Sequence, residues 1–223
     1  MRIAVIIPTH NEEGRIGTLL QTMPKYCDVI LADDSTDATQ EIALSNNAYV
    51  VSFPNTHWQY ISLKYFYGLK TAYDNEYEYA VTFDNGDNFH PDLINNLLLN
   101  AEGADVVIGQ RVFYGHGLRR LYSNVASIVA GLFGPKLKDA TCGLRLYKLD
   151  KIDFTGMMAK TPHAFQIEMI SKLYNAGCVI KTVDIPYRKP TDSTLKLSTF
   201  FDWFRVGLAL WKGRPKCNPQ KSP

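Results

Sequence analysis

Two carboxylates and two amides gather at the end of an apolar run in the stretch VTFDNGDNFHP, residues 81–91. Asp84 closes the run, and Asp87 and Asn88 follow within four residues. A simple turn would account for this pattern, because Asp, Asn and Gly are common turn residues. The same oxygen-rich side chains would suit a divalent cation that carries a phosphate-bearing substrate. The rest of the chain is needed to choose between these two interpretations.

Five short apolar runs rich in valine and isoleucine are expected to form strands. They cover residues 3–7, 28–32, 48–53, 79–83 and 105–109. Runs that are apolar throughout are typical of strands buried on both faces of a parallel sheet. Segments with helical spacing lie between them at 12–23, 35–44 and 91–103. This alternation predicts an α/β fold with a mostly parallel central sheet flanked by helices.

Polar and acidic residues follow four of these expected strands, in segments 8–13, 33–37, 84–90 and 109–111. In open α/β sheets, ligands bind beyond the carboxyl ends of the strands. Several acidic turns that converge on one edge of a sheet therefore favour a binding site over unrelated turns.

The regular alternation of strands and helices ends after residue 110. We expect a helix at 118–134, a strand at 142–150, a helix at 164–177, a strand at 178–187 and a last helix at 198–213. The last helix is rich in aromatic residues, has basic neighbours and is too short to cross a membrane. It is expected either to lie in a membrane interface or to pack on the domain. We therefore divide the chain into a domain at 1–198 and a C-terminal amphipathic helix with a basic tail at 199–223.

Composition narrows the class of protein. The chain has 223 residues and a net charge of +2, which predicts no nucleic-acid partner. Its four cysteines lack the paired spacing of a metal site and suggest a reducing compartment. No signal peptide is recognised in residues 1–13, and no window reaches the ~20 apolar residues of a spanning helix. We expect a cytoplasmic protein, peripheral on the cytoplasmic face of the membrane.

The ordered set of motifs from about residue 3 to residue 198 resembles the inverting family-2 glycosyltransferases of the GT-A fold. Within them it looks most similar to dolichyl- and polyprenyl-phosphate sugar synthases, such as dolichol-phosphate mannose synthases. The resemblance implies a metal-dependent hexosyltransferase that uses Mg²⁺ or Mn²⁺. It further implies a GDP- or UDP-sugar donor, a mannose or glucose type of sugar, and a lipid-phosphate acceptor.

Two segments resemble the family's nucleotide-binding motifs. VIIPTHNEE resembles the Pro-x-x-Asn-Glu segment, which implies that Pro8, His10, Asn11 and Glu12 contact the nucleobase and ribose. His10 stands where an aromatic residue is commoner, so it either stacks on the base or is a solvated loop residue. LADDSTDAT resembles Val-Asp-Asp-Gly-Ser-Thr-Asp, and Asp33 falls on the second aspartate of that motif. This alignment implies that Asp33 contacts the base.

The opening stretch resembles the family's Asp-x-Asp motif, whose carboxylates hold the cation that bridges the diphosphate. Asp84 aligns with the first aspartate. The second falls on Gly86 without an insertion, or on Asp87 with one extra residue, and we prefer the second register. The resemblance then implies that Asp84 and Asp87, with Asn88 as a weaker candidate, hold the metal and take part in catalysis.

The acceptor half of the resemblance rests on arginines. GQR at 109–111 resembles Gly-Ser-Arg, and Arg119 and Ser123 fit an Arg-x-x-x-Ser motif. The resemblance implies that Arg111, Arg119 and Ser123 bind the acceptor phosphate. The chemistry agrees, because a guanidinium matches phosphate geometry and residues four apart share a helix face. A surface position is the alternative for Arg119.

Three further residues complete the candidate site. Asp139 begins an Asp-x-x-x-Gly-x-Arg motif that lies near the junction of donor and acceptor in the family. The closing diphosphate loop of the family is matched poorly by residues 187–198, where Arg188 and Lys196 supply charge. The resemblance therefore implies a catalytic role for Asp139 and diphosphate binding by Arg188 and Lys196.

The expected reaction is a single in-line displacement with inversion at the anomeric carbon. A lipid phosphate is already anionic and needs no strong base. A sugar hydroxyl would need one, and Asp139 is then the candidate. The alternatives to a lipid-phosphate transferase are therefore a glycosyltransferase that acts on a sugar hydroxyl and a non-catalytic nucleotide-sugar-binding protein.

Overall fold

The computed structural model describes residues 1–53, 61–84, 89–112, 117–155, 159, 161–186 and 197–212, and the side chains of 117–123, 162–163, 197–200 and 211–212 lie outside that description. The elements of these residues run in the following order: β1 (Ile3–Thr9), α1 (Ile16–Thr22), β2 (Asp28–Asp33), α2 (Thr39–Ser45), β3 (Tyr49–Ser52), α3 (Ile61–Asp74), β4 (Tyr79–Thr82), α4 (Leu93–Leu99), β5 (Val106–Val112), α5 (Gly117–Phe133), β6 (Arg145–Lys148), a 3₁₀ turn (Leu149–Lys151), α6 (Pro162–Asn175), β7 (Ile180–Pro186) and α7 (Leu197–Lys212).

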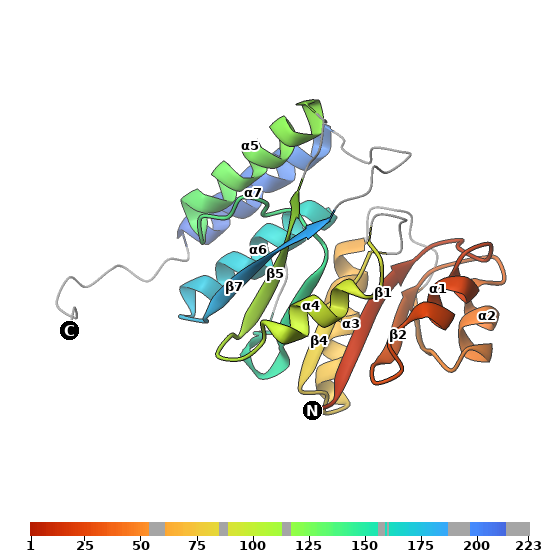
Figure 1. Ribbon diagram of the computed structural model, residues 1–223. Coiled ribbons are helices and arrows are strands. Elements are labelled where there is room, and N and C mark those ends of the chain that lie inside the picture. Colours follow the sequence, from red (N-terminus) through yellow and green to blue (C-terminus); the bar gives the residue numbers. More distant parts are fainter. Residues whose placement is uncertain are drawn as a thin grey trace.

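The strands form one sheet in the order β3-β2-β1-β4-β6-β5-β7 (Figure 1). β6 is antiparallel to β4 and β5, whereas the other paired strands are parallel. The carboxyl ends of β1, β2, β4 and β5 therefore meet at one edge of the sheet, together with the amino end of β6. The prediction of a mostly parallel α/β sheet is confirmed.

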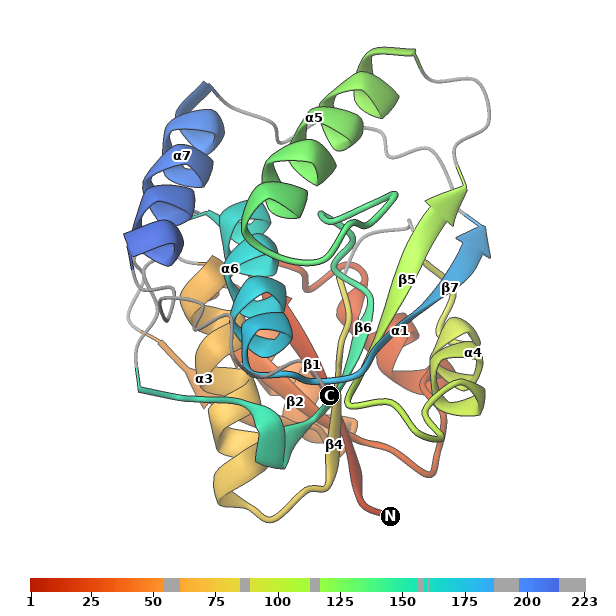
Figure 2. The same cartoon turned by 90° about the vertical axis from the view of Figure 1, so that its left-hand side faces the viewer.

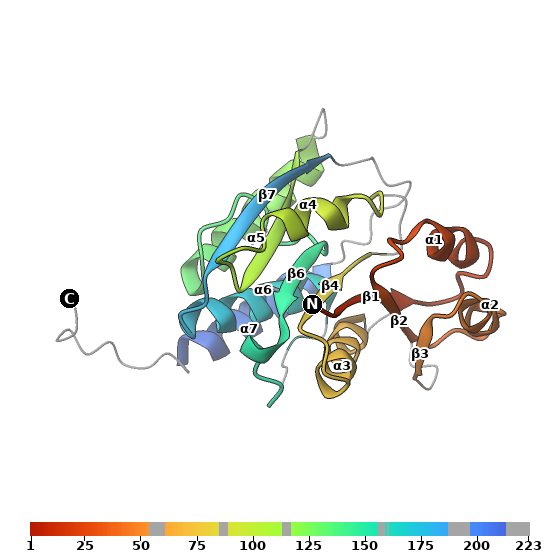
Figure 3. The ribbon, with the colours of Figure 1, turned by 60° about the horizontal axis from the view of Figure 1, so that its bottom comes forward.

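The strand β1 shows why apolar runs form the centre of this sheet. Ile3, Val5 and Ile7 belong to one buried cluster, whereas Ala4 and Ile6 belong to the cluster on the opposite face. Successive side chains of a strand point to opposite faces, so both faces must be apolar where helices cover both. Helices α1 and α4 cover the first face, and α3, α5, α6 and α7 cover the second (Figure 3).

Helix α3 was missing from the sequence-based assignment. Its packed face carries Lys64 and Gly68 among aromatic residues, which obscures the apolar spacing of a helix. A Cβ atom at Gly68 would lie 2.3 Å from Cγ2 of Ile6, so the glycine allows α3 to approach β1 closely. This approach also brings Lys64 and Tyr65 under the site described below.

Helices α5, α6 and α7 lie beside one another on one side of the sheet (Figure 2). A Cβ atom at Gly207 of α7 would lie 2.5 Å from the Phe133 ring of α5, which marks a close contact between these helices. One face of α7 buries Trp203 and Val206 in the core, while Phe201 and Phe204 on the other side are 72% and 68% exposed. Within the described ranges, no helix is long and apolar enough to cross a membrane.

Candidate active site

The loops that follow β1 and β2 are joined by a dense set of hydrogen bonds. The Asn11 N–H donates to Ser35 Oγ at 2.7 Å, and the Thr36 N–H donates back to Asn11 Oδ1 at 2.9 Å. The Glu12 N–H donates to Thr39 Oγ1 at 2.8 Å. Asn11 adopts a left-handed backbone with φ of 54°, a conformation that asparagine tolerates better than most residues. These two loops therefore form one ordered unit at the edge of the sheet.

The residues expected to contact the nucleotide lie on this unit. Pro8 is near the end of β1, and His10, Asn11 and Glu12 form the turn after it. The carboxylate of Glu12 accepts a hydrogen bond of 2.9 Å from Arg15 Nε. The structure thus brings Pro8, His10, Asn11 and Glu12 together beside the end of β2, and their contacts with a nucleotide stay a prediction.

Asp33 is fully buried, and both of its oxygens already accept hydrogen bonds from the chain. Thr9 Oγ1 and Ser35 Oγ donate to Oδ1 at 2.5 and 2.6 Å, and the Ser35 N–H and Gln40 Nε2 donate to Oδ2 at 2.9 and 2.8 Å. A carboxylate has about four acceptor positions, and these four donors fill them. The predicted base contact of Asp33 therefore has little acceptor capacity left, and the geometry gives Asp33 a role in fixing the loop.

The neighbouring Asp34 has spare capacity. Its Oδ1 accepts hydrogen bonds from Lys64 Nζ and from His10 Nδ1, the second at 2.8 Å. Lys64 is only 3% exposed and also donates to the Thr9 carbonyl at 2.6 Å. Oδ2 of Asp34 is buried without a hydrogen-bond partner. A buried acceptor without a partner is costly, so Oδ2 is suited to accept from a ligand donor.

Charge is balanced in this cluster by Lys64. Burial raises the pKa of Asp34, but hydrogen bonds from Lys64 and His10 lower it by more, and the pKa lies below its ordinary value. Asp34 therefore stays ionised at neutral pH. The sequence-based prediction missed Asp34, because the resemblance aligned it with the glycine of the Val-Asp-Asp-Gly-Ser-Thr-Asp motif. A gap at that glycine would have placed Asp34 on the second aspartate of the motif.

Asp84 follows β4 and is held from two sides. The Tyr65 hydroxyl donates a hydrogen bond to Asp84 Oδ1, and the Tyr65 ring stacks on Phe165 at 5.5 Å between centroids. On the other side lies Gly143, where an added Cβ atom would come within 2.5 Å of Asp84 Oδ2. Thr82 Oγ1 donates to the Gly143 carbonyl at 2.6 Å, which ties this loop to β4. The glycine thus leaves room for the carboxylate beside the backbone.

The donor set at Asp84 fits a hard divalent cation. The partly exposed carboxylate lies at the sheet edge, and cations such as Mg²⁺ and Mn²⁺ prefer oxygen ligands. Asp87 and Asn88 lie outside the described residues. Among the residues that are described, no group of three or more His, Cys, Asp or Glu side chains could hold a metal by itself. A metal site here would therefore combine Asp84 with ligands from 85–88 or from a substrate.

Arg111 and Asp139 form a buried ion pair at the ends of β5 and of the loop before β6. Arg111 Nε donates to Asp139 Oδ2 at 2.5 Å, and Nη2 donates to Oδ1 at 2.8 Å and to Thr141 Oγ1 at 2.6 Å. Their side chains are 7% and 2% exposed. Bidentate pairing of this kind is geometrically specific and strong. The structure thus joins two predicted site residues to each other.

The loop that carries Asp139 is fixed by a second arginine. Arg145 is fully buried, and its guanidinium donates to the carbonyls of Ala140, Cys142 and Gln166 at 2.6 to 2.8 Å. Because all three contacts are with backbone oxygens, Arg145 acts as a support for this loop. Burial raises the pKa of the Cys142 thiol to about 12, which excludes a thiolate nucleophile there at neutral pH.

The remaining predicted residues are only partly placed. The backbones of Arg119 and Ser123 lie in α5, near its amino end, and their side chains are outside the description. Arg188 and Lys196 lie outside the described residues altogether. Their roles in binding the acceptor phosphate and the diphosphate stay predictions.

Comparison with known proteins identifies the family of this chain. A family model described as "Glycosyl transferase family 2" matches residues 4–159, which is more than half of the chain. The chain belongs to glycosyl transferase family 2. The matched range covers both loops of the β1–β2 unit, Asp84 and the Arg111–Asp139 pair.

Two relatives of this family 2 protein are similar over most of its length. The "Low-salt glycan biosynthesis hexosyltransferase Agl6" of Haloferax volcanii is 28% identical over 218 residues, covering 91% of this chain and 51% of the relative. The "Undecaprenyl-phosphate mannosyltransferase" of Micrococcus luteus is 28% identical over 208 residues, covering 84% of each. The chain therefore spans about half the length of Agl6 but most of the length of the Micrococcus protein.

A solved structure shows that the fold is shared with GT-A glycosyltransferases. Glucosyl-3-phosphoglycerate synthase of Mycobacterium tuberculosis, crystallised with Mn²⁺, UDP and phosphoglyceric acid, aligns with a TM-score of 0.69. It is 19% identical, and the alignment covers 96% of this family 2 chain and 78% of that protein. At this identity the likeness establishes the fold alone, and the predicted GT-A fold is confirmed.

Proposed function

We propose that this family 2 glycosyltransferase transfers a hexose, with inversion, from a nucleotide-diphosphate sugar to a polyprenyl or dolichyl phosphate. The relatives support this assignment, because one is an undecaprenyl-phosphate mannosyltransferase and another a glycan hexosyltransferase by name. The observation that carries the choice of acceptor is the state of Asp139. Its carboxylate is almost completely buried and is engaged by Arg111 and Thr141.

The state of Asp139 separates the two kinds of acceptor. A sugar hydroxyl must lose a proton as it attacks, so it needs a base within hydrogen-bond reach. Both oxygens of Asp139 accept hydrogen bonds from Arg111, and Oδ1 also accepts from Thr141. The carboxylate therefore has little acceptor capacity left to take a proton from a hydroxyl. A phosphate monoester is already anionic near neutral pH and can attack without a base. The site therefore favours a lipid phosphate.

At the donor end, Asp34 replaces Asp33 in our assignment of the base contact. Asp34 Oδ2 has no partner in the described structure and can accept an N–H of the nucleobase. His10 lies against the same carboxylate and is partly exposed, so its ring can contact the base. Asn11 and Glu12 flank it on a turn fixed by hydrogen bonds to the β2 loop.

At the diphosphate, Asp84 would hold a divalent cation together with Asp87 and Asn88. The Mn²⁺ in the Mycobacterium structure supports this assignment, although it leaves the choice between Mg²⁺ and Mn²⁺ open. When bound, such a cation neutralises the charge that develops on the departing nucleoside diphosphate. Tyr65 and Gly143 orient the Asp84 carboxylate for this purpose. Arg188 and Lys196 would add positive charge to the same group.

The lipid acceptor also requires a membrane surface. Phe201 and Phe204 of α7 and Ile128 and Leu132 of α5 are each more than 60% exposed. Exposed apolar side chains on neighbouring helices can insert into a membrane interface. We therefore place the protein peripherally on the cytoplasmic face of a membrane, with α5 and α7 towards the lipid.

The reaction can be tested with a panel of donors and acceptors. The protein is incubated with GDP-mannose, GDP-glucose, UDP-glucose or UDP-galactose, with Mn²⁺ or Mg²⁺ and a short polyprenyl phosphate, and products are identified by mass spectrometry. We expect a glycosyl polyprenyl phosphate from one donor class, with the opposite anomeric configuration to the donor. Equal turnover of sugar-alcohol acceptors would contradict the lipid-phosphate assignment, and donor binding without any transfer would favour a non-catalytic protein.

Membrane placement has its own test. Phe201→Asp with Phe204→Asp should lower co-flotation with liposomes that contain anionic phospholipid, because both side chains lose favourable burial. Leu44→Asp with Leu99→Asp is a matched control, since these two residues are 61% and 81% exposed on other helices. Equal flotation of the two double variants would contradict the placement of α7 in the interface.

A further inference from the structure

The amino-terminal end of α6 supports Asp84 through an aromatic contact. Phe165 is fully buried, and its ring stacks on the Tyr65 ring with an interplanar angle of 17°. The Tyr65 hydroxyl donates the hydrogen bond that orients the Asp84 carboxylate. Because protein interiors are closely packed, the position of Phe165 restricts the position of Tyr65. The placement of Asp84 therefore depends on the position of this end of α6.

The same end of α6 supports the loop that carries Asp139. The Gln166 carbonyl accepts a hydrogen bond of 2.8 Å from Arg145 Nη1. The Arg145 guanidinium also donates to the carbonyls of Ala140 and Cys142, at 2.6 and 2.8 Å. Arg145 therefore joins the Asp139 loop to the main chain of α6.

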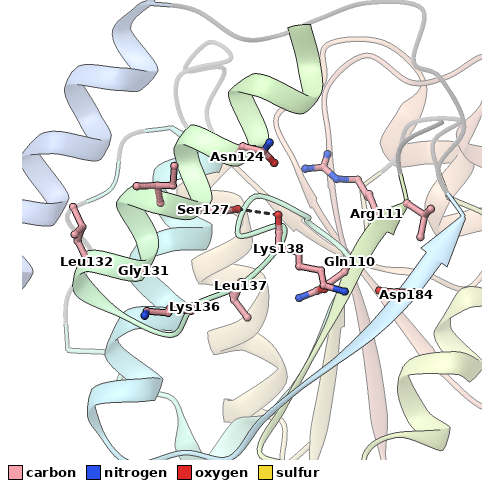
Figure 4. Close-up of a pocket in the computed structure, with 12 residues that line it drawn as sticks. Gln110, Arg111, Asn124, Ser127, Gly131, Leu132, Lys136, Leu137, Lys138 and Asp184 are labelled. Carbon is pink, nitrogen blue, oxygen red and sulfur yellow. Dashed lines mark hydrogen bonds between the residues drawn. The ribbon is translucent and has the colours of Figure 1, made fainter. Parts of the chain in front are cut away.

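Helix α5 holds this loop from another side. Ser127 Oγ donates to the Lys138 carbonyl at 3.2 Å and accepts from the Ala140 N–H at 3.0 Å, beside a groove of about 820 Å³ (Figure 4). Helix α7 contacts α6, and it also packs closely on α5 where Gly207 meets the Phe133 ring. Both helices that hold the loop are therefore in contact with α7.

A carboxylate of α7 fixes the start of α6. The Thr161 N–H and hydroxyl donate to Asp202 Oδ2 at 2.8 and 3.0 Å. Thr161 is the N-cap of α6, because its hydroxyl accepts from the Ala164 N–H at 3.4 Å and its carbonyl from the Phe165 N–H at 2.9 Å. Negative charge is also favourable at the amino end of a helix. Asp202 therefore anchors the turn that leads into Phe165 and Gln166.

The burial of Asp202 indicates what this contact provides. Asp202 is only 6% exposed, and Arg205 Nη2 donates to its Oδ1 at 2.6 Å. Burying a carboxylate costs free energy unless it is paired. Thr161 caps α6 with its own hydroxyl, so a helix cap alone does not require this carboxylate. The contact instead fixes where α6 lies relative to α7.

We propose that Asp202 is a positioning residue for the transfer reaction, which acts through Thr161 and the start of α6 on Asp84 and on the Asp139 loop. The inference rests on the proposed function, because that function assigns Asp84 to the donor and the Asp139 loop to the acceptor. Asp202 acts without contact with either substrate. A continuous series of contacts then joins α7 to both sides of the reacting centre.

Hydrogen–deuterium exchange tests the effect on the loop in the full chain without substrate or metal. Asp202→Asn keeps the size of the side chain and removes the charge from its hydrogen bonds with Thr161. We expect exchange in residues 139–145 to become roughly fivefold faster, and exchange in residues 33–37 of the β1–β2 unit to change less than about twofold. Equal acceleration in both segments would show a general loss of stability and overturn the proposal.

Three further variants locate the effect. Asp153→Asn is the matched control, because Asp153 also accepts from the N–H and hydroxyl of a threonine, Thr155, at 2.9 and 2.5 Å in an exposed turn. This variant and Thr161→Ser, which retains both donors to Asp202, should keep the exchange of the parent in 139–145. Thr161→Val should resemble Asp202→Asn. Parent-like exchange in Thr161→Val, or equal effects of Asp153→Asn and Asp202→Asn, would contradict the route through α6.

A double-mutant cycle tests the branch that leads to Asp84. Mn²⁺ affinity without nucleotide, measured by electron paramagnetic resonance, should fall roughly threefold in Asp202→Asn, less than for a direct partner of the ligand. In a Tyr65→Phe background the same substitution should cause no further loss, because the hydrogen bond that transmits the effect is already missing. Additive losses would overturn this branch.

Positioning and activity can fail separately. In the transfer assay Asp202→Asn should lower kcat roughly tenfold with little change in donor KM, because misplaced groups affect the transition state most. An active variant with the kcat and exchange pattern of the parent would overturn the positioning role and leave the transferase activity intact. If exchange in 139–145 responds but the parent protein uses no donor, the proposed function falls and the control of the loop by Asp202 stands.

Discussion

At the ends of β1 and β2, the polar groups of the site bond mainly to one another, whereas the face of β5 and β7 that looks towards α5 borders an open groove. The first region buries Asp33 with four donors and Asp34 with Lys64. The second has an ion pair of its own, Arg111 with Asp139, but Gln110, Lys136 and Lys138 line a groove of about 820 Å³. One region is therefore closed by its own hydrogen bonds, whereas the other leaves polar side chains at the wall of a cavity.

The contrast bears on how substitutions should act in each region. A preorganised loop loses little conformational freedom when a rigid nucleobase binds, which favours affinity. Substitutions should therefore lower folding stability more in the first region than along the groove.

The largest expected effect comes from breaking the ordered half. Lys64→Met leaves Asp34 buried without its cation and should lower the unfolding free energy by about 3–5 kcal/mol. Lys70→Met, which removes an exposed partner of Asp74, should lower it by less than about 1 kcal/mol. Urea denaturation of both variants measures the difference, and similar losses would contradict the buried pairing.

A second change separates folding from binding in that half. Lys64→Met combined with Asp34→Asn removes both charges and should recover most of the lost stability, because an unpaired buried charge costs more than a neutral pair. If Asp34 Oδ2 contacts the base, this double variant should still bind the nucleotide weakly in a thermal shift assay.

Substitution of Asp84, which lies between the two regions, should lower activity more than folding stability. Asp84→Asn should lower kcat by roughly 10²–10³-fold, the scale of losing one preorganised electrostatic group. Asp92→Asn is the control, since that aspartate is only eight residues further along the chain and its side chain is 79% exposed. Steady-state kinetics in Mn²⁺ would report the difference, and an active Asp84→Asn enzyme would contradict its place at the diphosphate.

The group that orients Asp84 should have a smaller effect. Tyr65→Phe removes one hydrogen bond to the carboxylate and should weaken Mn²⁺ binding about tenfold, near the lower end for outer-shell partners. Tyr147→Phe is a matched control, because this tyrosine is equally buried and its hydroxyl lies 3.5 Å from Gln166 Oε1. Electron paramagnetic resonance of free Mn²⁺ gives both affinities, and equal values would leave Tyr65 with a packing role only.

Stability should also respond to acid through the ordered half. The pKa of Asp34 lies below its ordinary value in the folded chain, so its ionised form stabilises the fold above about pH 4, near the unfolded pKa. This contribution should decrease as pH falls through the lower folded pKa. Unfolding free energies between pH 7 and pH 3 measure it, and the Lys64→Met, Asp34→Asn variant should lack this component of the pH dependence.

The smallest effect on folding is expected in the open half. Gln110→Leu replaces a side chain at the wall of the groove, only 6% exposed, with an apolar one and should leave the unfolding free energy unchanged or raise it by up to about 1 kcal/mol. Thermal denaturation of the parent and the variant measures the change. A loss of several kcal/mol would show that the Gln110 amide contributes to the fold.

The sequence predicted the layout of the site better than its individual contacts. Apolar runs such as 3–7 and 79–83 located β1 and β4, and the carboxyl-end rule then placed Asp33 and Asp84 at the same edge. Local pattern was sufficient there because a buried parallel strand must be apolar on both faces.

Contacts between distant segments could not be read in this way. Lys64 reaches Thr9 and Asp34 from a helix that the sequence pattern did not reveal. The antiparallel strand β6 brings Gly143 against Asp84 from 59 residues away, and its direction depends on the pairing with β4 and β5. The distinction between Asp33 and Asp34 depends on which of them finds donors within the chain.

The terminal helix illustrates why the end of this domain cannot be removed cleanly. Asp202 of α7 accepts hydrogen bonds from the backbone N–H and hydroxyl of Thr161, at 2.8 and 3.0 Å, and Thr161 is the first residue before α6. Cutting the chain ahead of α7 would remove that acceptor and expose core residues that Trp203 covers. Shortened versions prepared for crystallisation or fusion should therefore retain residues through 212, and point substitutions are the better way to alter its outer face.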